Sequence, residues 1–258
     1  MRHTVVTLSR GDAHKIAEWV DYHSRLGFED FQIVLDGDVD GTEDVLRSLD
    51  VPARARVTVH PREEVGEYYD GMSPEERRHH VLQWRARHAE ALESGAMRGI
   101  DALAWRQHLH LPEIMAPYAA GARGRGWLAL IDVDEFVVLT RHRSIGEVTA
   151  EATAQRLRLL NFNVDTTGYD PSRPVLAQHT VRWSHEDLLA HPTRRWAGRV
   201  KSIVRYRCAR LDHTVHKISR GRHVLLDPEV ARLHHFKMPP NSELDIPFTV
   251  HDPVRLPG

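Results

Sequence analysis

Three short apolar segments near the start of the chain, separated by helical patterns, constrain the fold most strongly. TVVTLS at residues 4–9, FQIVLD at 31–36 and RVTVH at 56–60 are rich in the β-branched and aromatic residues that favour strands. Over residues 12–27, between the first two segments, apolar side chains recur at helical spacing. The order strand, helix, strand, helix, strand predicts a parallel sheet covered by helices on both faces.

The rest of the chain is less regular, and we expect a single domain with two halves. Residues 61–120 carry two long helical patterns and predict a helical insertion, with Ser73 as an N-cap before Pro74. Another apolar strand is expected at 127–132, and residues 160–250 alternate short strand-like segments with loops. The predicted fold class is therefore α/β, with a mostly parallel central sheet and a less regular α+β C-terminal half.

Composition excludes several classes of protein. The formal net charge is −1, from 35 basic and 36 acidic residues, so bulk charge does not favour nucleic-acid binding. No window approaches the roughly 18 apolar residues of a transmembrane helix, and the first residues do not resemble a signal peptide. Cys208 is the single cysteine, which rules out an intrachain disulfide and makes a cytoplasmic protein the default expectation.

The segment WLALIDVDEFVVL, residues 127–139, ends a strand-like run with three carboxylates. Ligand sites in open α/β sheets lie at the carboxyl ends of strands, and hard divalent ions prefer oxygen ligands that they often share with phosphates. Asp132 and Asp134 therefore predict a site where Mg²⁺ or Mn²⁺ bridges the protein to a diphosphate. Glu135 is expected to point away from both, because neighbours on an extended backbone face oppositely. A solvated turn with unpaired acids is the simpler alternative.

A phosphatase with an aspartate nucleophile is a second alternative for the same acids. Phosphatases of the haloacid dehalogenase type usually carry Thr or Val two residues after the second aspartate, and their motif usually lies near the N-terminus. This chain has Phe136 at that place, and the motif lies in mid-chain. The phosphatase is therefore the less favoured interpretation.

Three further segments carry groups that suit phosphate or metal chemistry. Asp36 ends a strand before a glycine-rich turn, where a carboxylate can accept hydrogen bonds from a base or a ribose, although an ordinary turn explains it equally well. Lys201, in GRVKSIVRYR, can neutralise a diphosphate, but an edge strand with one polar face shows the same alternation. His216 and His235 can complete an acidic metal site, although most of the 19 histidines are expected on the surface.

Taken together, these segments resemble glycosyltransferases of family 92 and the related family 2. The resemblance is carried by EWVDYH (residues 18–23), Gly27 and Phe31, then by WLALIDVDEF, VKSIV, HTVH and LHHFK in preserved order. It implies a GT-A type, Rossmann-like fold that binds a nucleotide-diphosphate sugar. Residues 1–136 would form the nucleotide-binding half, and residues 137–258 the half that binds the acceptor and completes the metal site.

The resemblance also implies a reaction. A UDP-sugar would donate its sugar, with inversion, to a glycan, lipid-linked or other hydroxyl acceptor, as in polysaccharide biosynthesis, with Mn²⁺ or Mg²⁺ as a Lewis acid. No nucleic-acid partner is expected, and peripheral membrane association is compatible with such an acceptor. The alternative is a non-catalytic relative that binds a nucleotide or a carbohydrate.

The same resemblance assigns residues to the site. Those implied for nucleotide binding are Ser9, Arg10, Asp36, Asp132 and Lys201, and those implied for the metal are Asp132, Asp134, His216 and His235. Asp165, Glu186 and Asp187 are the candidates for the carboxylate base that inversion requires. The chain departs from the family pattern at Arg10, Gly11 and Asp12, which replace a usual Lys-Asn-Glu and change the side chains beside the expected nucleotide site.

Overall fold

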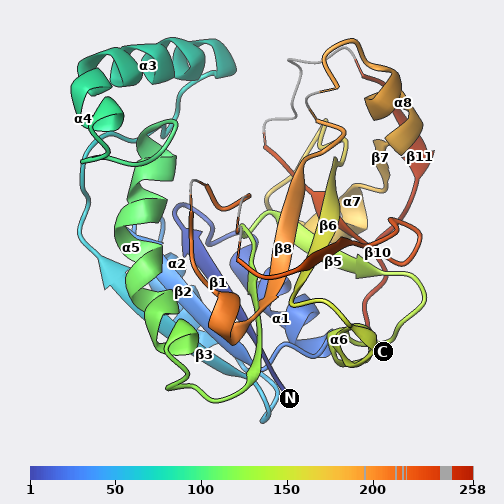
Figure 1. The fold of residues 1–258 in the computed structure, drawn as a ribbon. Helices are drawn as coiled ribbons and strands as arrows, with labels where there is room; N and C mark the ends of the chain where they lie inside the picture. The colour runs from blue at the N-terminus through green and yellow to red at the C-terminus, as the bar shows by residue number, and fades with distance from the viewer. Residues whose placement is uncertain (195, 213, 217, 219, 239–245, 258) are drawn as a thin grey trace.

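The structure is a computed structural model that describes residues 1–194, 196–212, 214–216, 218, 220–238 and 246–257. A mixed sheet with strand order β3-β2-β1-β4-β8-β6-β10-β5 runs through the molecule, with β9 beside β6, and β7 pairs separately with β11 (Figure 1). The strands are β1 (Arg2–Ser9), β2 (Asp30–Asp36), β3 (Arg56–Arg62), β4 (Gly126–Leu130), β5 (Glu135–Leu139), β6 (Arg156–Asn163), β7 (Val181–Trp183), β8 (Val200–Arg205), β9 (His223–Leu225), β10 (Ala231–His235) and β11 (Phe248–His251). The helices are α1 (Ile16–Arg25), α2 (Thr42–Ser48), α3 (Pro74–Arg87), α4 (Ala89–Glu93), α5 (Ala102–Ala119), α6 (Ile145–Glu151), α7 (Val175–Gln178), α8 (His185–Ala190) and the 3-10 helix η1 (Tyr206–Cys208). No helix in this described part of the chain combines the length and the apolar character of a membrane span.

The first three strands confirm the sequence prediction. β1, β2 and β3 pair in parallel, with Thr4 opposite Asp30 and Asp30 opposite Arg56. Val5 of β1 belongs to the core that contains α1 and α2, whereas its neighbour Val6 belongs to the core beneath α5. Successive side chains of a strand point to opposite faces, so the sheet is buried on both sides here, as parallel sheets usually are.

From β4 onward two antiparallel strands, β8 and β5, join the otherwise parallel sheet. β4 pairs in parallel with β1, but β8 lies between β4 and β6 and runs antiparallel to both. At the far edge β5 runs antiparallel to β10. Antiparallel neighbours need no crossover helix, so the short segments of the C-terminal half can join the same sheet directly. The α/β class is confirmed. Most strand pairs of the large sheet are parallel, as expected, but the antiparallel strands β8 and β5 make it a mixed sheet, so a Rossmann-like parallel sheet is not confirmed.

The segment predicted as a helical insertion divides into two parts. α3 buries only Trp84 and begins with the predicted cap at Ser73, which exchanges hydrogen bonds with Glu76 in a capping box. α5, in contrast, packs Leu111 and Met115 into the core against β1 and forms part of the layer that covers the sheet (Figure 1). The prediction of an insertion is therefore wrong for α5. Helical periodicity does not indicate which of two helices buries its apolar face against a sheet.

Candidate active site

The candidate site is built around the turn that joins β4 to β5. β4 ends at Leu130, and the first acid follows two residues later, beyond the paired part of the strand. The Glu135 amide donates a hydrogen bond to the Asp132 carbonyl at 3.0 Å, and the Asp132 amide donates to a Glu135 carboxylate oxygen at 3.0 Å. These two hydrogen bonds close the turn and bring the side chain of Glu135 back toward Asp132.

Lys201 joins two of the acids. Its side chain is fully buried, and Nζ lies 2.7 Å from Asp132 Oδ2 and 3.0 Å from Glu135 Oε2. The other oxygen of Glu135 accepts a hydrogen bond from Asn161 Nδ2 at 2.6 Å. Burial would lower the pKa of Lys201, but Asp132 and Glu135 outweigh this effect and hold that pKa above its usual value. Because β8 is an interior strand, the edge-strand interpretation of Lys201 is wrong.

The position of Glu135 corrects the prediction that it points away from the two aspartates. That prediction assumed an extended backbone from Asp132 to Glu135, but the chain leaves β4 at Leu130 and turns before β5 begins. Side-chain alternation holds along a strand and not across a turn. Burial raises the pKa of Glu135, against the opposing effect of Lys201. The buried network also excludes the alternative of a solvated turn with unpaired acids.

Asp134 faces His235 on β10. His235 Nε2 lies 3.1 Å from Asp134 Oδ2. Burial would raise the pKa of Asp134, but His235 and, after it, Lys15 outweigh this effect and hold that pKa below its usual value. His234 points to the opposite face and lies 3.0 Å from Asp252, as expected for adjacent residues of one strand. The histidine beside the acidic turn is therefore His235.

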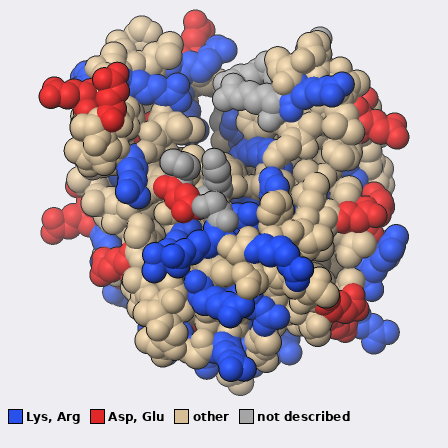
Figure 2. Space-filling view, in the orientation of Figure 1, with Lys and Arg blue, Asp and Glu red and all other residues tan. Residues whose placement is uncertain are grey.

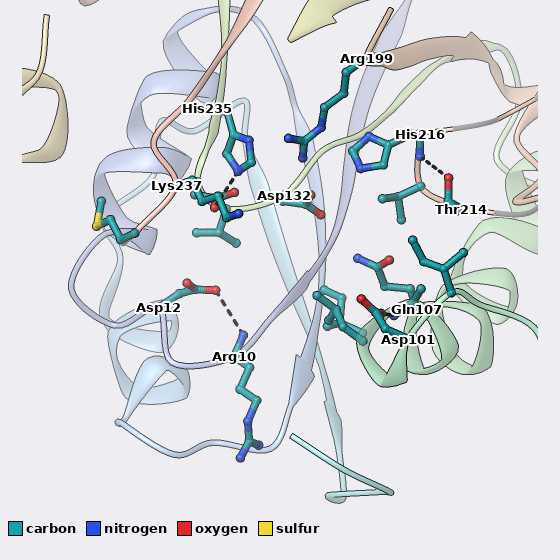
Figure 3. A pocket seen from close by; sticks show the side chains of 18 of the residues that line it. Arg10, Asp12, Asp101, Gln107, Asp132, Arg199, Thr214, His216, His235 and Lys237 are labelled. Atoms are coloured by element: carbon teal, nitrogen blue, oxygen red, sulfur yellow. Dashed lines mark hydrogen bonds and ion pairs between the residues drawn. The ribbon is translucent and has the colours of Figure 1, made fainter. Parts of the chain in front are cut away.

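A cavity of about 600 Å³ opens beside the acidic turn and the end of β1 (Figure 3). Its volume lies within the range of roughly 300–1,000 Å³ that small-molecule sites occupy. Asp132, Asp134 and His235 line it, together with the cationic side chains of Lys15 and Arg199. On the face shown in Figure 2, Lys and Arg side chains gather around the hollow between the α3 and α8 sides of the molecule. The cavity thus combines a few carboxylates with a basic surround, which suits an anionic ligand.

The donor atoms of the site test whether it fits a divalent ion. Asp134 Oδ2 and His235 Nε2 supply an oxygen and a nitrogen on the cavity wall, and Nδ1 of His216 and His235 has no hydrogen-bond partner among the described residues. Burial, aided by Lys201 and Arg199, lowers the pKa of His216 to about 2, so its imidazole is neutral, the form that binds metals. No three acidic, histidine or cysteine side chains of the described residues converge as a metal cage. The donors therefore fit an ion that completes its shell with phosphate oxygens and water, as Mg²⁺ often does.

The residues that replace the usual N-terminal family motif form a network at the end of β1. Asp12 accepts a hydrogen bond from Ser9 Oγ at 2.8 Å and pairs with Lys15 Nζ at 2.8 Å. The guanidinium of Arg10 pairs with Glu64 at 2.8 Å and with Asp70 at 2.5 Å. Arg10, Asp12 and Lys15 line the cavity. Ser9 is buried and is linked to the cavity wall through its hydrogen bond to Asp12.

Asp36 is fully buried and does not line the cavity. Its carboxylate accepts hydrogen bonds from Arg106 Nε at 2.6 Å and from the Tyr68 hydroxyl at 3.2 Å. The guanidinium groups of Arg10 and Arg106 both pack on the Tyr68 ring, 3.7 and 3.9 Å from its centroid. The carboxylate of Asp36 is thus already hydrogen-bonded to protein groups, and its contact with a nucleoside stays a prediction.

The motif EWVDYH on α1 holds the backbone that follows the acidic turn. Trp19 Nε1 donates to the Glu135 carbonyl at 2.9 Å, and the Tyr22 hydroxyl donates to the Val137 carbonyl at 2.8 Å. His23 Nε2 accepts from the Val137 amide at 3.3 Å. The sequence pattern indicates only that Trp19 and His23 lie on the buried face of a helix. The signal for this positioning role was the presence of hydrogen-bonding groups on three ring side chains of one helix, Trp19, Tyr22 and His23.

The candidates for the catalytic base lie away from the cavity lining. Asp165 accepts a hydrogen bond from the Thr167 amide, and Glu186 and Asp187 lie in the first turn of α8. Among the described residues, the carboxylates that line the cavity are those of Asp12, Asp101, Asp132 and Asp134. The structure therefore brings the predicted metal and diphosphate residues together, but it does not bring the three base candidates to them. Their catalytic role stays a prediction.

A comparison with known families identifies the class of protein. Residues 125–254, half of the chain, match the model of glycosyltransferase family 92. The protein is thus a glycosyltransferase, an enzyme that moves a sugar from a nucleotide-sugar donor to a glycan acceptor, and it belongs to family 92. No curated protein matches the chain significantly. The match includes the acidic turn, β8 and β10, and it removes the phosphatase interpretation.

Proposed function

We propose that this glycosyltransferase takes its sugar from a UDP-sugar and transfers it, with inversion, to a hydroxyl group of a glycan. The observation that carries this proposal is the pair Asp134–His235, 3.1 Å apart on the wall of a cavity that also holds Lys15 and Arg199. A carboxylate and an imidazole beside two cations suit a diphosphate with its divalent ion. Uridine is the nucleoside that the family resemblance implies.

In this proposal Asp134 and His235 hold Mn²⁺ or Mg²⁺, and His216 offers a further neutral imidazole on the same wall. When bound, the ion acts as a Lewis acid and stabilises the charge that develops on the leaving diphosphate. Arg199 adds fixed positive charge on the cavity wall, where such charges act more strongly than in water, and Lys15 adds a smaller share because Asp12 partly matches its charge at 2.8 Å. Positive charge around the diphosphate thus makes it a better leaving group.

Lys201 has a different part in this proposal. Its ammonium already pairs with Asp132 at 2.7 Å and Glu135 at 3.0 Å, so its charge is largely matched inside the protein. The pairing holds one oxygen of Asp132 and leaves the partly exposed carboxylate directed at the cavity. We therefore assign Lys201 a positioning role toward Asp132, and we assign Asp132 to the donor. The carboxylate base that inversion requires remains to be chosen among Asp165, Glu186 and Asp187 or the acids of the cavity wall.

Isothermal titration calorimetry with UDP, in the presence and absence of Mn²⁺, tests the proposal. We expect Mn²⁺ to strengthen binding to the wild type, and Asp134→Asn and His235→Gln each to weaken the Mn²⁺-dependent binding by about tenfold or more. His251→Gln changes an exposed histidine on β11 and should bind as the wild type does. A protein that binds no nucleoside diphosphate would contradict the proposed donor. Equal binding with and without Mn²⁺ would contradict the metal alone.

A further inference from the structure

The expected base-binding end of the cavity receives no carboxylate from β2. Asp36 has no exposed surface, and its two oxygens are engaged by Arg106 and by Tyr68. The neighbouring Arg10 is held by residues 64–70, whose Tyr68 ring packs against both guanidinium groups. A nucleobase can reach Asp36 only by displacing Tyr68 or Arg106 from its carboxylate, and displacing Arg106 would break a buried ion pair.

One face of α5 forms the wall of the cavity on this side. Ile100, just before the helix, and Leu103, Ala104 and Gln107 line the cavity. Their spacing of i, i+3, i+4 and i+7 places them along one helical face. Leu8, at the end of β1, lines the same space. This part of the cavity is therefore largely apolar, with Gln107 as the polar group of the stripe.

Gln107 is nearly buried, with 7% of its surface exposed, and its amide makes no hydrogen bond to another described residue. Asp101, the other polar side chain that α5 and its cap bring to the wall, already accepts a hydrogen bond from the Ala104 amide at 2.8 Å. Figure 3 shows Gln107 and Asp101 together on the α5 side of the cavity, across from Asp12. The amide is not among the fully buried polar atoms that lack a partner, so it keeps access to the cavity, where a ligand can satisfy both of its hydrogen-bonding groups.

We propose that Gln107 reads the nucleobase of the sugar donor, in place of Asp36. This assignment rests on the proposed function, because it requires a nucleotide donor. A carboxamide presents a donor and an acceptor side by side, which matches the edge of uracil where a carbonyl adjoins an N–H. Leu8 and Leu103 supply apolar surface for the flat faces of the base. A base that leaves the amide unpaired is rejected, so Gln107 sets specificity as well as affinity.

Calorimetry with two ligands isolates the base. We expect Gln107→Leu to bind UDP with Mn²⁺ about tenfold more weakly than the wild type, because both hydrogen-bonding groups are lost. Its affinity for inorganic pyrophosphate with Mn²⁺ should be unchanged, since pyrophosphate has no base. Gln107→Glu keeps acceptor oxygens but loses the donor, and it should also weaken UDP binding selectively. Gln83→Leu changes an exposed glutamine on α3 and serves as the matched control.

Asp36→Asn separates the two candidate base readers. We expect it to lower the melting temperature, because it weakens the buried pair with Arg106, and to leave UDP affinity within about twofold of the wild type. Gln107 is not the base reader if Gln107→Leu binds UDP as tightly as the wild type, or if it loses pyrophosphate binding to the same extent. Selective loss of UDP binding in Asp36→Asn alone would return the role to Asp36. A wild type that binds neither UDP nor pyrophosphate contradicts the proposed function itself, and this assignment with it.

Discussion

Replacing His23 by leucine tests whether α1 holds the strand after the acidic turn through one neutral imidazole. His23 is fully buried, its Nδ1–H donates to the Trp19 carbonyl at 2.9 Å, and its Nε2 accepts from the Val137 amide at 3.3 Å. This pairing requires the neutral ring, because a protonated ring would direct a second N–H at the Val137 N–H. Burial accordingly lowers the pKa of His23 from 6.5 to about 3.

The difference in the free energy of unfolding between the wild type and His23→Leu depends on pH, and this dependence identifies the neutral ring. In the leucine variant the buried Val137 amide loses its acceptor, which should lower the free energy of unfolding by roughly 2 kcal/mol at pH 7.5. The pKa of His23 is higher in the unfolded chain than in the folded protein, so protons bind the unfolded chain preferentially and wild-type stability falls as the pH falls below 6.5. At about 1.4 kcal/mol per pH unit, this effect of His23 reaches roughly 2 kcal/mol near pH 5. Leucine does not titrate, so the difference between the two proteins should vanish there.

Urea denaturation of the two proteins at pH 7.5, 6 and 5, followed by circular dichroism, measures this difference. The parallel substitution His251→Leu removes an exposed histidine of β11 and should leave the stability within about 0.5 kcal/mol of the wild type. A wild-type advantage that stays constant between pH 7.5 and 5 would refute the buried neutral ring. An advantage that grows on acidification would reverse the sign of the reasoning.

Three other substitutions test buried ion pairs and close packing in the sheet. Lys201→Met leaves two carboxylates without their buried cation and should lower the free energy of unfolding by about 3–5 kcal/mol in a denaturant titration, whereas a loss below about 1 kcal/mol would contradict the network. Burial opposes ionisation of Asp252, but His234 and two buried arginines outweigh it and hold its pKa below the usual value, so its stabilising effect is present above about pH 4 and is lost on acidification. Asp252→Asn should therefore be less stable than the wild type at pH 7 by denaturation, with a difference that shrinks below about pH 4. Gly126→Ala places a methyl group against the Arg2 carbonyl and the Tyr206 ring, and it should lower the free energy of unfolding by about 1–3 kcal/mol in a thermal unfolding experiment. Gly198→Ala places its methyl group in open space and should be nearly neutral.

Local patterns predicted the elements that are defined by short-range physics. The strands at residues 4–9, 31–36 and 56–60 lie where β-branched runs predicted them. The first two are buried almost throughout and are therefore largely apolar, whereas the third is a half-buried edge strand. The cap at Ser73 formed as expected, since a capping box involves residues only three positions apart. The opposite directions of His234 and His235 are likewise a local property, because adjacent side chains of a strand point to opposite faces.

Other features depended on which distant segments meet. α5 covers the sheet and α3 does not, although both segments have helical patterns. β8 lies between β4 and β6 and runs antiparallel to both. The partners of Asp36 come from a loop and a helix that the sequence pattern could not place against β2. Hydrophobic periodicity reports the burial of each residue, and it contains no information on the order or direction of strands.

The chain's sequence by itself determined that carboxylates end an apolar strand, and that a lysine and a histidine follow on later strands in the order typical of family 92. Only the tertiary structure decided the pairing: Lys201 with Asp132 and Glu135, and His235 with Asp134. The physical reason is that each pair joins residues far apart in the chain, so its geometry depends on strand order and on the turn after β4. The same turn brought Glu135 into the network, against the expectation of an extended backbone.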